Sequence, residues 1–491
     1  MKVIFSVLVL ALIGFAAVFL YTNQTGGSPV SESAQAVSLC EEGSADLNAF
    51  RLNDARDKLL ASLELDPDLA EASISLAYTY ARLGREPEFK STLARADSLV
   101  ANISDPDRRM MAQLRLADAS DSRFYSIRDS LVDRLKKEKP KNVHVLVALT
   151  KRAKTPEEQE KAWQKVMDAD PNYAVTYNML GYLELHRANY DKAIEHMQKY
   201  AFLAPDLANP HDSLGDVYFA TGRYEEAEEE YVTSVTMQPD FYVSLINLGR
   251  TYLARGQMDK GEDILEKVRA EVRGSKLEQQ VDQEILMTMV TYDVDNALDE
   301  VSARFITEHP DNGNAAFFRA MRLAYKGQMN ESQAVMDSAL TVWRLSDPYK
   351  NYEEFRKNVD RSGKRYEALL ADLADAPATR VRHWGGLVAM SSDVVIHDQW
   401  YDRWRLGQAL LDNNQPQLAL EQIAPVLNVN PRLINPLILA VESYLALRQP
   451  EPARQSLEQA KRALAWADSD FPPVARAKEL EKKVAELEGS S

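Results

Sequence analysis

Apolar and small residues recur along this chain with the spacing of amphipathic helices, and the whole pattern repeats with a fixed period. Leu-Gly pairs stand at 180–181, 214–215 and 248–249, one pair in every 34 residues. The residues after the middle pair, which have counterparts in the neighbouring units, are Tyr218, Ala227, Tyr231 and Pro239. A helical periodicity that restarts every 34 residues predicts a series of hairpins, each made of two antiparallel helices.

Each recurring residue type has a mechanical role in such a hairpin. The glycines mark points where the two helices approach closely, and Ala193, Ala227 and Gly261 are the small residues expected opposite them. Pro205 and Pro239 fall just beyond second helices, which a ring without an N–H ends. The order L-G-x2-Y, A-x3-F, P resembles the tetratricopeptide repeat. That resemblance implies an all-α, right-handed superhelical solenoid of helical hairpins that binds other polypeptides.

The period divides the chain into segments. Repeats of this kind are expected over 45–340, best formed over 174–273, and again over 400–470, about ten to eleven hairpins in all. Residues 471–491 are predicted to form a charged helix that caps the stack. A unit cannot bury its apolar face alone, so neighbouring units must stack on one another.

The segment 341–399 departs from the period and is predicted to be an atypical helical insertion. It carries a basic and aromatic stretch and leads into two more tryptophans of the following unit. One interpretation is a longer helix pair whose tryptophans fill a joint of the solenoid. The other is a second partner-binding surface, because Trp and Arg dominate interaction hot spots. Its candidate residues are Arg380, Arg382, Trp384, Trp400 and Trp404.

The N-terminus predicts attachment to a membrane. Residues 3–21 contain no charge and are long enough, as a helix, to cross a hydrocarbon core of about 30 Å. Lys2 precedes this stretch and no further Lys or Arg follows before Arg51, which favours repeats on the outer, periplasmic side of a bacterial inner membrane. The alternative is a cleaved signal and a secreted or periplasmic protein. Residues 22–44, rich in Gly, Ser and Gln, are predicted to be a flexible linker.

Charge and composition narrow the function. The net charge of −16 argues against nucleic acid as a partner, because phosphates would be repelled. The seven histidines show no metal-binding spacing, and the single cysteine, Cys40, has no base near it in sequence. The acidic run 225–230 is interpreted as a solvated helix face. We therefore predict no catalytic site, no metal and no cofactor, and hence a protein that is not an enzyme.

Binding in the concave groove of the solenoid is the function that remains, since first helices line that side. The residues expected to face a bound peptide or protein are Asn178, Tyr182, Asp212, Asp216, Phe219, Asn247, Arg250 and Leu253. The cations with which some tetratricopeptide domains clamp a chaperone's C-terminal carboxylate are missing from the corresponding positions, which excludes that ligand. The sequence thus predicts a membrane-tethered scaffold or adaptor for envelope protein assembly. A self-associating scaffold is the alternative, and an enzyme with a site in 341–399 is the least favoured one.

Overall fold

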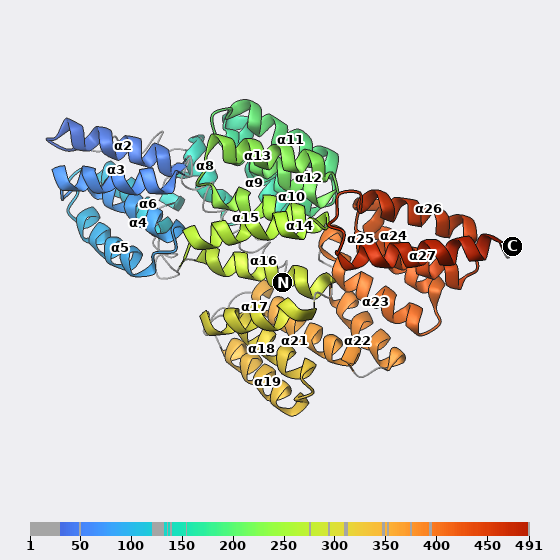
Figure 1. The fold of residues 1–491 in the computed structure, drawn as a ribbon. Helices are drawn as coiled ribbons and strands as arrows, with labels where there is room; N and C mark the ends of the chain where they lie inside the picture. The colour runs from blue at the N-terminus through green and yellow to red at the C-terminus, as the bar shows by residue number, and fades with distance from the viewer. Residues whose placement is uncertain are drawn as a thin grey trace.

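The structure is a computed structural model, and every regular element in its described residues is helical (Figure 1). It describes residues 30–48, 51–119, 132–134, 136–137, 140–153, 155–273, 276–292, 295–308, 313–345, 349–350, 353–373, 376–391 and 395–489. The predicted all-α fold is confirmed over these ranges. No helix within them is long and apolar enough to span a membrane. The predicted anchor, 3–21, lies outside the described residues.

The helices follow one another as hairpins. The N-terminal ones are α2 (Ala34–Asn48), α3 (Leu52–Leu65), α4 (Ala70–Arg82), α5 (Glu86–Ala101), α6 (Pro106–Ala119), α8 (Val143–Thr150) and α9 (Pro156–Ala169). The central ones are α10 (Ala174–His186), α11 (Tyr190–Leu203), α12 (Asn209–Ala220), α13 (Tyr224–Met237), α14 (Tyr242–Ala254) and α15 (Met258–Glu271). Then come α16 (Lys276–Tyr292), α17 (Asp295–Glu308), α18 (Gly313–Tyr325), α19 (Met329–Leu345), α21 (Glu353–Leu373) and α22 (Pro377–Met390).

The C-terminal part comprises the short 3₁₀ helix η2 (Ile396–Asp398) and five α-helices. These are α23 (Trp400–Asp412), α24 (Pro416–Val429), α25 (Ile434–Ala446), α26 (Pro450–Ala463) and α27 (Pro472–Gly489). Residues 341–399, predicted to be an insertion, contain the end of α19 and the pair α21 and α22, which pack between α19 and α23. With 21 residues, α21 is longer than α19 and α22, which have 17 and 14.

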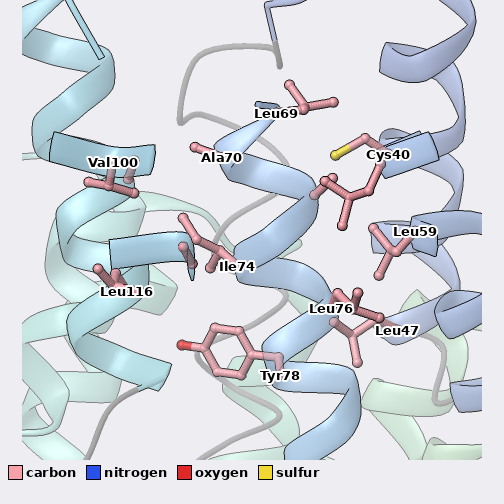
Figure 2. Close-up of a cluster of buried hydrophobic side chains, with 14 of the residues drawn as sticks. Cys40, Leu47, Leu59, Leu69, Ala70, Ile74, Leu76, Tyr78, Val100 and Leu116 are labelled. Carbon is pink, nitrogen blue, oxygen red and sulfur yellow. The ribbon is translucent and has the colours of Figure 1, made fainter. Parts of the chain in front are cut away.

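One boundary of the sequence prediction needs correction. Residues 34–44, predicted to belong to the flexible linker, form most of α2, whose contacts are with α3 and α4. The cause is burial on one side of the helix. Ala36 and Cys40 belong to the N-terminal core. Figure 2 shows Cys40 beside Leu59 and Leu76. Gly43 lies so close to Leu59 that a Cβ would sit 2.8 Å from its Cγ.

The close approach predicted at the Leu-Gly pairs is confirmed. A Cβ on Gly215 would lie 2.6 Å from the Tyr231 ring, and one on Gly181 would lie 2.8 Å from Met197. Contacts this short would force the two helices of the hairpin apart. Ala227, opposite on α13, is fully buried.

The chain also folds back on itself, which the repeat pattern does not predict. The turns inside the three central hairpins contact three successive loops of the C-terminal part about 207 residues later, as Figure 1 shows for α10 to α15 beside α23 to α27. We call the six segments together the turn–loop interface. Its turns lie at 186–190, 221–225 and 255–259, and its loops lie at 396–398, 430–432 and 466–471.

The same 34-residue period on both sides brings the partners into register. The first turn meets the first loop through Tyr190, whose hydroxyl lies 3.3 Å from Nδ1 of His397. In the second pair, Nδ2 of Asn430 donates to the Tyr224 hydroxyl at 3.1 Å. In the third, the Asp468 N–H donates to the carbonyl of Gly256 at 2.9 Å. Successive turns and successive loops are both separated by about one repeat, so all three turn–loop pairs lie in contact.

Candidate functional site

The predicted groove residues lie mostly inside the protein. Asn178, Tyr182, Asp212, Asn247 and Leu253 are all buried, with at most 5% of their surface exposed. Their helices, α10, α12 and α14, stack side by side, so these side chains point into the joints between repeats. A bound peptide would have to displace intramolecular contacts to reach them.

A polar network, which we call the carboxylate network, joins the three helices. It consists of Tyr182, Asp212, Asp216, Tyr231, Ser244 and Asn247. Tyr182 and Tyr231 donate their hydroxyls to the two oxygens of Asp216, at 2.9 and 2.8 Å. Asn247 donates to Asp212 and Asp216 at 3.1 and 3.2 Å, and the Ser244 hydroxyl donates to Asp212 at 2.6 Å. Each repeat thus contributes a donor or an acceptor to the next one.

Burial makes the two carboxylates costly to ionise. Removal from water raises the pKa of Asp212 to about 7, and the charge of Asp216 adds to that rise against the hydrogen bonds from Ser244 and Asn247. Burial also raises the pKa of Asp216, whereas Arg250 and the two tyrosine hydroxyls act in the opposite direction. The guanidinium of Arg250 lies 3.9 Å from Asp216 and 4.3 Å above the Phe219 ring. The network therefore places two buried carboxyl groups between neighbouring repeats, with the guanidinium of Arg250 as the adjacent cation.

Replacement of Asp212 by asparagine is expected to flatten the dependence of stability on pH. The folded protein holds a proton on Asp212 that the unfolded chain, with an ordinary pKa near 3.8, has released, so stability falls as pH rises from about 4 through 7. Each unit of such a shift corresponds to about 1.4 kcal/mol. Urea unfolding midpoints between pH 4 and 8 measure the slope. The exposed Asp206→Asn serves as the control, and equal slopes in all three proteins would contradict the expectation.

Two predicted residues need separate correction. Leu253 does not face a groove; it packs inside its own hairpin, where a Cβ on Gly261 would lie 2.6 Å from it. Asn178 is buried next to the network, but none of the hydrogen bonds above involves it, and its Oδ1 has no partner among the described residues. Only Phe219, Asp216 and Arg250 keep a partly exposed surface.

Tyr231 and Ser244 belong to the network although the repeat pattern does not indicate it. Tyr231 occupies the F position of the A-x3-F motif, where the repeat pattern indicates packing alone. The available signal was the Asp212 and Asp216 pair itself. Carboxylates four residues apart on an otherwise buried helix require donors from neighbouring helices, because unpaired buried charges are strongly unfavourable.

The second set of candidates is only partly accessible. Trp384 is fully buried, and its Nε1 donates to Asp372 at 3.0 Å, so it joins α22 to α21 instead of offering a contact surface. Trp400 and Trp404 stack at 6.5 Å and pack on the core of α24 and α25. Arg380 forms an ion pair with Asp412 at 2.6 Å. Arg382 is the one exposed member of the set.

The acidic run 225–230, predicted to be a solvated helix face, also makes contacts within the protein. Glu228 accepts hydrogen bonds from Tyr252, at 2.5 Å, and from Arg255 of the next repeat. Glu225 forms an ion pair with Arg432 across the turn–loop interface. At least these two glutamates therefore connect structural units. Among the described residues no group of side chains is arranged to hold a metal ion.

Comparison with known protein families gives a match in the central helices. Residues 218–278, from α12 through α15 to the start of α16, match the family described as tetratricopeptide repeat. Over this stretch the chain is similar to the tetratricopeptide repeat. The match includes three residues of the carboxylate network, Tyr231, Ser244 and Asn247. The tetratricopeptide repeat is a helical unit that generally mediates protein–protein contacts. None of the curated protein sequences matches the chain significantly.

Similar solved structures include several helical repeat proteins. One is the anaphase-promoting complex hetero-tetramer Cut9–Hcn1, with 13% identity over 94% of this chain and 77% of that chain and a TM-score of 0.42. Another is MamA, with 24% identity over 30% of this chain and 88% of that one and a TM-score of 0.27. A third is TTC0263, a thermophilic tetratricopeptide repeat protein of Thermus thermophilus. It shares 19% identity over 44% of this chain and 99% of that one, with a TM-score of 0.24.

Proposed function

We propose that this protein is a non-catalytic scaffold, tethered to a bacterial inner membrane by residues 3–21, that holds partner proteins on the periplasmic side. The tetratricopeptide match of residues 218–278 is the observation that carries the scaffold role. The uncharged N-terminal stretch and the absence of Lys and Arg between Lys2 and Arg51 support the membrane attachment and its direction.

The turn–loop interface supports a rigid scaffold. Stacked repeats normally contact only their neighbours, so an open solenoid bends along its length. Here the central and C-terminal hairpins are cross-connected at three points, which restrains that bending. Most of the predicted groove residues are buried and cannot contact a partner. We therefore place the proposed partner contact at the partly exposed surface around Phe219 and Arg250.

A site-specific crosslinking experiment in native membranes tests this function. A photoreactive phenylalanine analogue replaces Phe219 on α12 or, as the matched control, Phe202, which is 74% exposed on the second helix α11. We expect a defined protein adduct at position 219 and none at 202. Adducts of the chain with itself at 219 would favour the self-associating scaffold, and identical adducts at both positions would contradict a partner surface at Phe219.

The tether has its own test. Removal of residues 2–21 is expected to move the chain from the membrane to the soluble fraction. A chain that stays on the membrane after this deletion would refute the anchor without affecting the crosslinking result.

A further inference from the structure

The N-terminal hairpins contain an arginine in an unusual environment. Arg115 of α6 keeps only 5% of its surface exposed, and its Nη2 donates to the Ser75 hydroxyl of α4 at 3.4 Å, which is a long hydrogen bond. Its Nε has no acceptor among the described residues. Burial lowers the pKa of Arg115. A guanidinium has five N–H donors, so most of its bonding capacity is unused here.

The buried carboxylates of these hairpins are paired with other cations. Glu71 of α4 accepts two hydrogen bonds from Arg108, at 2.7 and 2.8 Å, in a bidentate pair. Asp46 of α2 forms an ion pair with Lys58 of α3 at 2.7 Å. Among the described side chains, neither carboxylate forms a hydrogen bond with Arg115. Among the described residues the charge of Arg115 is offset at a distance by Cys40 and by a Glu71 carboxylate that Arg108 already neutralises. Burial raises the pKa of Cys40 to about 12, so its thiol is uncharged at neutral pH.

The surroundings of Arg115 offer further donors and little water. The hydroxyls of Ser44 and Ser75 lie 2.9 Å apart. Apolar neighbours complete the region, with Ile74, Tyr78 and Leu116 drawn together in Figure 2. A cation in such surroundings is strongly unfavourable unless an anion accompanies it.

We infer that Arg115, with the hydroxyls of Ser44 and Ser75, forms a binding site for an oxyanion between α2, α4 and α6. A planar guanidinium binds the paired oxygens of a carboxylate or a phosphate, and the hydroxyls of Ser44 and Ser75 can donate further hydrogen bonds to such oxygens. The anion is either free in solution or the acidic side chain of a peptide. This site lies on different hairpins from the proposed partner surface at Phe219, so an experiment that refutes one of the two proposals leaves the other unaffected.

Hydrogen exchange of the full-length protein tests the site, with inorganic phosphate and an acetylated hexaglutamate peptide as separate probes at constant ionic strength. We expect at least one of the two probes to slow exchange in α4 and α6 by roughly tenfold in the wild type, because a ligand stabilises the state that binds it. Arg115→Met is expected to lose this response. Arg109→Met removes the same charge from a half-exposed position on the same helix, and it should keep the response.

The two probes distinguish the sources of the anion. A response to phosphate alone supports a free oxyanion, and a response to the peptide alone supports a carboxylate of a partner. Two results would overturn the site: no change in α4 and α6 with either probe, or an equal response in Arg115→Met. Stability in anion-free buffer gives a further check. The Arg115→Met protein should unfold at the same or a higher temperature than the wild type, and a marked decrease would show that the charge is already compensated within the protein.

Discussion

Replacement of Gly256 by alanine is expected to break the third contact of the turn–loop interface. Gly256 has a φ of +76°, which disfavours any side chain, and a Cβ there would lie 2.6 Å from the ring of Phe471 and 2.8 Å from Ala467. Phe471 is rigid and only 2% exposed, so it cannot turn aside. The contact between Gly256 and the loop 466–471 should therefore break, and hydrogen exchange should rise sharply in that loop and in 255–259.

Gly327 provides the matched control for this prediction. It has nearly the same φ, +75°, but no atom lies within 4 Å of where its Cβ would be. Gly327→Ala therefore measures the backbone strain alone, which is about 1–2 kcal/mol. The strain itself is tolerable, since Ala188 adopts a φ of 61° in the first central turn. If Gly256→Ala and Gly327→Ala lower the unfolding temperature equally, the close packing at the turn–loop interface is refuted.

The second large effect is expected from Trp384→Ala. Trp384 is fully buried between α21, α22 and α23, and its ring packs edge-on against Tyr401 at 6.0 Å. Its loss removes that packing, leaves a cavity and takes a hydrogen bond from Asp372. The expected cost is about 3–5 kcal/mol in the free energy of unfolding. Urea denaturation followed by circular dichroism measures it.

Trp466→Ala is the control for this substitution. Trp466 is 59% exposed and lies over the guanidinium of Arg255 at 5.7 Å, so its removal should cost well under half as much. A Trp384→Ala protein that is as stable as Trp466→Ala would mean that Trp384 does not hold the joint. It would restore the interpretation of that residue as an exposed contact for a partner.

Cross-connection at the turn–loop interface changes how this repeat protein should behave. In an open solenoid, stability is close to a sum over units and their nearest-neighbour contacts. Here Tyr224 and Asn430, which are 206 residues apart in the chain, share a buried hydrogen bond. Unfolding of the C-terminal hairpins therefore removes contacts from the central ones, and the two regions should lose protection together.

The carboxylate network shows a limit of inference from family resemblance. Positions that often face a ligand in tetratricopeptide repeats are expected to carry binding residues, and Tyr182 and Asp216 occupy such positions. In this chain their side chains satisfy each other at 2.9 Å across the joint between two repeats. The sequence placed these residues on the first helices of their hairpins, but it did not reveal what their side chains contact.

The sequence by itself determined the local structure of this protein. Glycine at 181, 215 and 249 and proline at 205 and 239 act through close approach and through backbone chemistry within one unit, and these effects are visible at short range. The helical hairpins, their period and the small residues at their crossings could therefore be predicted. The first helix was missed between 34 and 44, because a stretch rich in small and polar residues becomes helical only when Ala36 and Cys40 are buried by later helices.

Only the tertiary structure decided which surfaces remain available. The contacts of Tyr190 with His397 and of Gly256 with Asp468 join residues more than 200 positions apart, and no local pattern records such a pairing. The exposure of Asp212, Trp384 and Arg115 likewise depends on how many neighbouring helices surround each one. Burial is a property of the whole assembled chain, so the accessible and inaccessible members of a repeated motif look alike in the sequence.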